Sequence, residues 1–141
     1  MIGMFTKFFV LLFLLGSQTH ASSVDWQLIY EGDEVGGYKS YFDPNSVNVV
    51  GTTVYAWGLT DFNKPQAVNF ILNTSLSTLS YSEVDCQLKR ARSHQLIAHK
   101  ENMGRGKVVK RVGMTEWFYP PPNSADATVM LITCKLIATL P

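Results

Sequence analysis

Hydrophobic and polar residues alternate along most of the chain after residue 25, with the period of two that is typical of strands with one buried face. The alternating runs are rich in Val, Thr and aromatic residues, and Gly, Pro or Asn stands between them. One of these runs turns near Gly51, which indicates a hairpin. The pattern therefore predicts a β-sheet of about six strands, formed by residues 26–30, 38–43, 47–61, 75–86, 92–100 and 106–112.

The last apolar segment, residues 127–138, fits either a buried strand or a helix. Its Thr, Val and Ile content suits a strand, but the prolines before it would stop one, and Asn123 or Ser124 offers an N-cap with Asp126 in the first turn. In a helix, one stripe would contain Ala127, Met130, Leu131 and Cys134. We therefore predict an α+β fold in which one C-terminal α-helix packs on one face of the sheet.

The first 21 residues have the composition of a secretory signal peptide. Lys7 precedes an apolar run at residues 8–15, and small and polar residues follow up to Ala21. The run is shorter than the roughly 20 residues that span a bilayer. We expect cleavage after Ala21, which leaves residues 22–141 as a single domain without a cysteine at its start for lipid attachment.

Cys86 and Cys134 are the two cysteines of the chain, and we interpret them as a disulfide. An even cysteine count in an exported protein is typical of paired cysteines. The less favoured alternatives are a reactive thiol, for which His94 would be the nearby base, and a metal site, although no C-x-x-C pair is present. Cys86 shares the apolar positions of its run with Val84 and Leu88, so a disulfide would tether the helix to that face of the sheet.

Charge is distributed unevenly along the expected mature chain. Residues 25–85 carry eight acids and two bases, and the residues from Cys86 onward carry nine bases and three acids. Antiparallel pairing across the turn at 101–106 would bring Lys100 close to Lys107 and gather the bases on two strands. The candidate ligand-binding residues are Lys89, Arg90, Arg92, Arg105, Lys107, Lys110 and Arg111.

A basic strand face of this kind attracts sulfated glycans, acidic protein segments or anionic lipid headgroups. The alternative is a solvated face that only balances the acidic half of the chain. Nucleic acid is disfavoured, because the protein is expected to be exported and its mature net charge is zero.

Catalytic chemistry is not indicated by the sequence. No G-x-S-x-G segment is present, and His94 and His99 would point to opposite faces of one straight strand. We therefore predict a protein that is not an enzyme, with no catalytic, metal or cofactor-binding residues. The aromatic segment Trp117–Tyr119 is expected to pack under a turn, with an exposed recognition surface as the alternative.

Several segments occur here in an order that resembles the surface-adhesin E family. They run from about Trp26 to Cys134 and are YFDPNSV, VYAWGLTDFNKPQ, a Ser-rich run ending in VDC, a basic stretch, a Met-Gly-x-Gly loop, EWFYPPPNS and a terminal cysteine. The resemblance implies an antiparallel sheet with a C-terminal helix, paired cysteines and export to the envelope of a Gram-negative bacterium. It also implies an adhesin that binds host matrix or plasma proteins, and a possible dimer.

We therefore expect a binding module at the cell surface, the outer membrane or in the periplasm. The alternative function is a periplasmic accessory protein that binds a bacterial partner. Self-association is expected through a sheet edge, formed either by residues 26–30 or by Ser75–Ser82, because both segments are uncharged.

Overall fold

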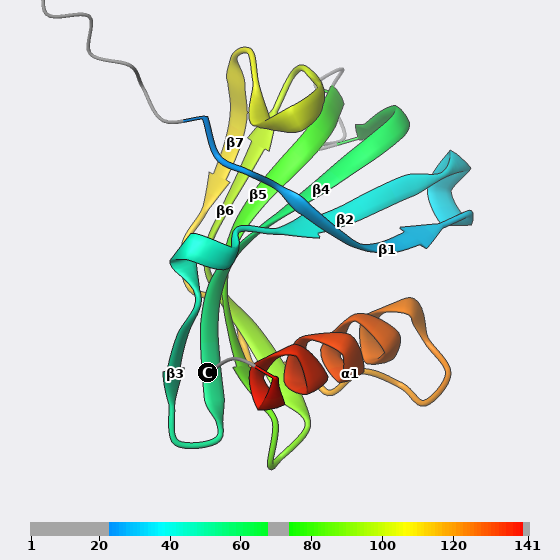
Figure 1. Cartoon of the computed structure of the whole chain (residues 1–141). Coiled ribbons are helices and arrows are strands. Elements are labelled where there is room, and N and C mark those ends of the chain that lie inside the picture. Colours follow the sequence, from blue (N-terminus) through cyan, green and yellow to red (C-terminus); the bar gives the residue numbers. More distant parts are fainter. Residues whose placement is uncertain (1–22, 68–73, 140–141) are drawn as a thin grey trace, which may run out of the picture.

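The computed structural model describes residues 23–67 and 74–139 (Figure 1). The expected signal peptide and its cleavage site lie outside the described residues. Within them, the chain forms one antiparallel sheet and one α-helix, as the sequence predicts.

All pairings in the sheet are antiparallel, in the order β1-β2-β4-β5-β6-β7, and β3 pairs with the first part of β4. The seven strands are β1 (Gln27–Gly32), β2 (Tyr38–Phe42), β3 (Asn48–Val50), β4 (Thr53–Ala67), β5 (Thr74–Asp85), β6 (Arg90–His99) and β7 (Val108–Val112).

The segment between β2 and β3 turns because Asp43 caps a short 3₁₀ turn, η2 (Pro44–Ser46). The Asn45 N–H donates to Asp43 Oδ1 (2.9 Å), and Pro44 supplies a fixed φ at the first position of the turn. The Trp57 N–H of β4 donates to Ser46 Oγ (2.8 Å), so the turn takes the place of a strand beside that residue. β2 and β3 can therefore follow one another along the same side of β4.

The predicted end of β4 at residue 61 is wrong, because the strand runs on through Asn63, Lys64 and Pro65. β4 continues to Ala67, and its pairing with β5 changes register between Asp61 and Gln66. Proline has no N–H to give to a ladder, and an irregular register accommodates it because no ladder bond is required there.

Successive side chains of β4 and β5 point to opposite faces of the sheet, and each face buries different residues. Val54 is buried on the face toward the helix, and Leu59, five residues later, is buried on the opposite face. The opposite face is covered near Leu79 by the 3₁₀ turn η3 (Asn102–Gly104). Figure 1 shows α1 (Ala125–Ala138) lying below β1 and β2.

The helix begins where the sequence predicts. Ser124 Oγ accepts from the Ala127 N–H (3.1 Å), and Asp126 lies in the first turn, where a carboxylate suits the helix dipole. Met130 is buried against the sheet, whereas Leu131, which was expected on the same stripe, is 55% exposed. Nearly every position of α1 is apolar, so spacing alone did not identify the buried side. Among the described residues, no helix is long and apolar enough to cross a membrane.

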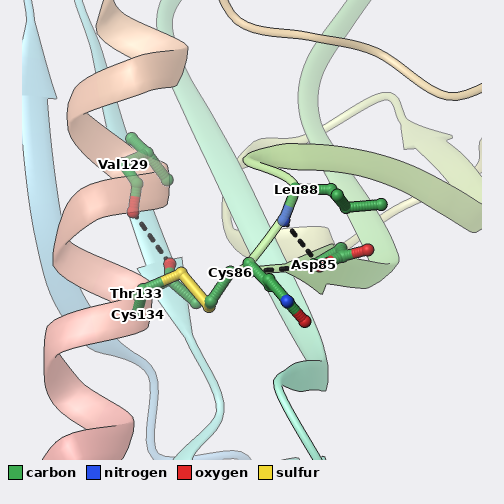
Figure 2. The surroundings of a disulfide bond; sticks show 7 residues. Asp85, Cys86, Leu88, Val129, Thr133 and Cys134 are labelled. Atoms are coloured by element: carbon green, nitrogen blue, oxygen red, sulfur yellow. Dashed lines mark hydrogen bonds between the residues drawn. A yellow bond between two sulfur atoms is a disulfide. The ribbon is translucent and has the colours of Figure 1, made fainter.

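A disulfide joins Cys134 of α1 to Cys86, directly after β5 (Figure 2). The two Cα atoms are 5.8 Å apart, and the predicted pairing and tether are confirmed. Leu88 does not share the apolar face with Cys86, because the chain turns there: Asp85 Oδ1 accepts from the N–H groups of Gln87 (3.1 Å) and Leu88 (3.0 Å). Leu88 is consequently 55% exposed.

β1 and β7 are the outer strands of the sheet. β5 lies between β4 and β6, so the expectation that Ser75–Ser82 forms an edge is wrong. Self-association through a sheet edge therefore stays a prediction that concerns β1.

Candidate binding surface on strands β6 and β7

The predicted basic residues lie at two ends of β6. One group is at the turn between β5 and β6, and the other is at the hairpin between β6 and β7. β6 is ten residues long, which corresponds to about 33 Å of extended chain. We call the first group the β5–β6 end, formed by Lys89, Arg90 and Arg92. The second group is the basic hairpin, formed by Lys100, Arg105, Lys107, Lys110 and Arg111.

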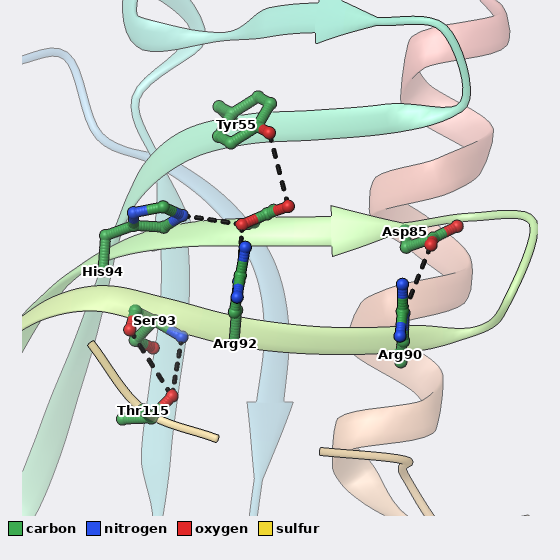
Figure 3. Close-up of polar contacts among 8 residues, drawn as sticks. Tyr55, Asp85, Arg90, Arg92, Ser93, His94 and Thr115 are labelled. Atoms are coloured by element: carbon green, nitrogen blue, oxygen red, sulfur yellow. Dashed lines mark hydrogen bonds and ion pairs between the residues drawn. The ribbon is translucent and has the colours of Figure 1, made fainter. Parts of the chain in front are cut away.

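At the β5–β6 end, the two arginines are paired with acids of the neighbouring strand (Figure 3). Arg92 Nε donates to Glu83 Oε2 (2.7 Å), and Arg90 Nε donates to Asp85 Oδ2 (3.3 Å). In the strand register, Glu83 lies opposite Arg92 and Asp85 lies opposite Arg90. Both carboxylates are buried, so charges that the sequence suggested for ligand binding are neutralised inside the protein.

Glu83 is the centre of a larger polar group. Besides the bond from Arg92, its carboxylate accepts from His94 Nε2 (2.7 Å) and from the Tyr55 hydroxyl (3.3 Å). Burial by itself raises the pKa of Glu83, but the hydrogen bonds from Arg92 and His94 and the charge of Arg92 outweigh it. The pKa of Glu83 is therefore held below its usual value, and the carboxylate stays charged at neutral pH.

Asp85 is also held charged. The Leu88 N–H is the main cause of its lowered pKa; burial opposes it, and Arg90 and the Gln87 N–H add to it. Asp85 thus fixes the turn after Cys86 and neutralises Arg90 at the same time.

Trp117 lies beneath the two arginines. The guanidinium carbons of Arg90 and Arg92 are 4.0 and 4.2 Å from the centre of its ring, which is cation–π geometry. Phe118 and Tyr119 are 46% and 60% exposed, so the expectation that the aromatic segment packs under a turn is wrong for these two residues. A single strand bridge between Ala91 and Phe118 holds this segment beside β6, and Tyr119 is hydrogen-bonded to the Arg90 side chain.

Aromatic rings continue along the same face of the sheet from the Glu83 group. Trp57 and Tyr81 have ring centroids 5.3 Å apart, and Tyr81 and His94 are 5.8 Å apart. The alternation in VYAWGLTD indicates that Tyr55 and Trp57 share a face. It does not indicate that Glu83 and His94 join them, because that depends on the pairing of β5 with β4 and β6.

The basic hairpin is held by bonds from the sheet to its turn. Lys100 and Lys107 are paired as predicted, with the Lys100 N–H donating to Lys107 O (2.8 Å). Asp61 Oδ1 accepts from the Met103 N–H (2.7 Å) and from Asn102 Nδ2 (3.1 Å), which fixes Met103 in a left-handed conformation at φ 59°. The tip with its exposed bases is therefore rigidly placed.

The strand register divides the hairpin charges between the two faces. Lys110 lies opposite Ala98 and Arg111 lies opposite Ile97, so these neighbours project from opposite sides of the sheet. Arg105 and Lys107 stand at the tip and are exposed. The positive charges thus surround the end of the hairpin and do not form a ribbon along one face.

Metal ligation finds no support in the described part of the chain, where no three His, Cys, Asp or Glu side chains are grouped to hold an ion. His94 is bonded to Glu83, and His99 Nδ1 lies 3.3 Å from Gly106 O.

A comparison with known protein families identifies the family of this chain. The model of the family described as surface-adhesin protein E matches residues 26–135, which include every strand of the described sheet, the disulfide and most of α1. This chain belongs to the surface-adhesin protein E family. The resemblance read from the sequence is thereby confirmed.

Solved structures of protein E from Haemophilus influenzae have the same fold. One is 16% identical with a TM-score of 0.55, and the match covers 84% of this chain and 93% of the other. A second crystal form is also 16% identical with a TM-score of 0.54, over 71% and 83% of the two chains. No curated protein sequence matches the chain. At this identity the structures establish the fold, and the ligand has to be argued from the surface of this chain.

Proposed function

We propose that this adhesin-family domain is an exported, non-enzymatic binding module that contacts an acidic or polyanionic partner, such as a host matrix component, through the basic hairpin. The observation that carries the proposal is the different state of the two basic groups. Arg90 and Arg92 are bound to buried acids, whereas within the described chain no ion pair holds Arg105, Lys107 or Arg111.

The geometry of the hairpin suits recognition of delocalised negative charge. Its exposed bases stand around a tip that Asp61 and Ser77 hold against the sheet: Ser77 Oγ, which is fully buried, accepts from the Gly104 N–H (2.9 Å). A fixed tip loses little conformational freedom on binding. The entropy cost of ordering a loop therefore offsets little of the free energy gained from charge attraction. Such attraction increases association rates and weakens as salt screens it, over about 8 Å at physiological ionic strength.

Reversing the charge of the tip tests the proposal. We expect the double variant Arg105→Glu/Lys107→Glu to lose binding to immobilised heparin and to polyglutamate, and we expect the affinity of the unmodified domain to fall steeply with salt. The control is Lys39→Glu/Lys135→Glu, which makes the same change in net charge at exposed positions on β2 and α1. Its folding should be unaffected, because the exposed pair of Lys39 with Glu31 contributes little.

Equal binding by the two double variants would show that the hairpin is only a solvated surface. Where the domain acts needs a separate measurement. Protease treatment of intact cells should cleave the domain if it is a cell-surface adhesin, and protection until the outer membrane is opened would instead support the periplasmic accessory role.

A further inference from the structure

A cavity of about 640 Å³ lies between α1 and the sheet. Protein interiors contain few voids larger than a water molecule, and pockets that bind small molecules measure about 300–1,000 Å³. The cavity is therefore of the size of a ligand site, and it is far from the basic hairpin surface that carries the proposed function.

Small side chains on the sheet create the space. The positions of β4, β5 and β6 that face the helix are occupied largely by residues that fill little volume: Ala56, Gly58, Ser80, Ser82, Ala91 and Ser93. The helix presents Val129, Met130 and Thr133 to the same cavity, and the disulfide fixes its position. Because a tethered helix cannot sink onto the small residues, the space between the two layers persists.

Some of the hydroxyl groups in the walls are already bonded within the protein. Ser82 Oγ donates to Ser80 Oγ (3.2 Å), and Thr133 Oγ1 donates to Val129 O (2.9 Å) within the helix. More than half of the residues that line the cavity are apolar, among them Ile29, Val54 and Val129. Water is stable in a cavity when several polar groups need it, whereas apolar cavities take up apolar molecules. The walls thus favour hydrocarbon.

Charge is confined to the margin of the cavity. Only Arg92 and Asp126 among its lining residues are charged. The Arg92 guanidinium is bonded to Glu83 on the other face of the sheet, and Asp126 is exposed in the first turn of α1. A charged group of a ligand would have no partner deep inside, and it would have to remain near the solvent.

The shape of the lining indicates an elongated occupant. Lining residues reach from Ile29 on β1 to Ser93 on β6, across β2, β4 and β5. With neighbouring strands about 4.8 Å apart, these residues extend over about 19 Å. We propose that the cavity binds the hydrocarbon chain of a single-tailed amphiphile, a free fatty acid or a lysophospholipid, with the polar headgroup at the rim.

Titration of the oxidised domain with cis-parinaric acid, a fluorescent fatty acid, tests this site. We expect saturable binding of one probe per chain and its displacement by palmitate. Displacement by lysophosphatidylcholine as well would show that only the chain is recognised, and displacement by palmitate alone would show that the rim also selects a carboxylate. The proposal is overturned if neither competitor displaces the probe, or if the probe does not bind.

Filling the cavity provides the structural control. Ser82→Leu places a branched side chain in the space and should weaken probe affinity by at least about tenfold, since each buried methylene contact that is lost changes affinity severalfold. Gln95→Leu adds the same group at an exposed position of β6 on the opposite face and should bind as the unmodified domain does. If Ser82→Leu does not fold, Ala56→Val makes a smaller filling. Unchanged affinity in a folded filling variant would place the probe elsewhere and refute the site.

Discussion

Removal of the Cys86–Cys134 bond should detach α1 from the sheet. The cysteines are 48 residues apart in the sequence, and the chain-entropy relation for a loop of this length gives about 4 kcal/mol of stabilisation at 25 °C. Met130 is the buried hydrophobic side chain that the helix contributes to the core, and its burial is worth about 1.5–3 kcal/mol. The bond therefore contributes more to the stability of the domain than the burial of Met130 does.

The double variant Cys86→Ser/Cys134→Ser should show this in two ways. Urea unfolding followed by the fluorescence of Trp26, Trp57 and Trp117, which all lie outside α1, should show a lower free energy of unfolding. The slope with urea should also be smaller, because a native state with a loose helix already exposes part of its surface. Proteases should cleave residues 113–124, which connect β7 to the helix, much faster than in the oxidised domain.

The reduced but otherwise unmodified domain is the matched control, since it lacks the bond without carrying new hydroxyl groups. A loss below about 1 kcal/mol with unchanged protease protection, in both the variant and the reduced domain, would refute the reasoning. It would mean that packing around the cavity holds the helix without the tether.

Two other predictions concern carboxylates that accept hydrogen bonds within the domain. Because the pKa of Glu83 is lowered in the folded state, its contribution to stability is present above the unfolded pKa of about 4.3 and is lost as pH falls through the folded pKa. Glu83→Gln should thus lower the melting temperature at pH 7. Thermal scans across pH should show that the difference in melting temperature between this variant and the unmodified domain becomes smaller below about pH 4. A difference that stays constant with pH would contradict the lowered pKa of Glu83. Asp61→Ala should cost about 1–3 kcal/mol and increase amide exchange at Met103, because it removes the acceptor that holds the hairpin tip, whereas Asp61→Asn keeps a carbonyl acceptor and should lose less; equal exchange in both variants would argue against this role.

Local sequence patterns predicted most of the fold for a physical reason. Period-two alternation reports which side of a strand is buried, and Ser124 with Asp126 reports where a helix begins, so both depend only on neighbouring residues. Predictions failed where distant segments decide the outcome. The pattern does not predict the exposure of Leu131, because most positions of α1 are apolar, and it does not predict the central place of β5, because strand order does not follow from the composition of one strand.

The cavity and the exposed aromatic residues could not be read from the sequence for a related reason. Ser80, Ser82 and Ala91 are ordinary strand residues until the register aligns them on one face under a tethered helix. Phe118 and Tyr119 are exposed because a single bridge at Ala91 holds their segment beside β6, and nothing in EWFYPPP indicates that partner.

The register between β5 and β6 explains the uneven distribution of charge along the chain. In EVDCQLKRAR the acids and bases are separated by a turn, and antiparallel pairing places Glu83 opposite Arg92 and Asp85 opposite Arg90. A slip of one residue would turn these side chains to opposite faces and leave buried acids without partners, so the register is strongly determined. Pairing therefore removes Arg90 and Arg92 from the bases available to a ligand, and Lys89 stays exposed in the turn. Most of the positive charge that remains is at the far end of β6, on the hairpin, and this separation is the reason why stability should respond to Arg92 and ligand binding should respond to Arg105 and Lys107.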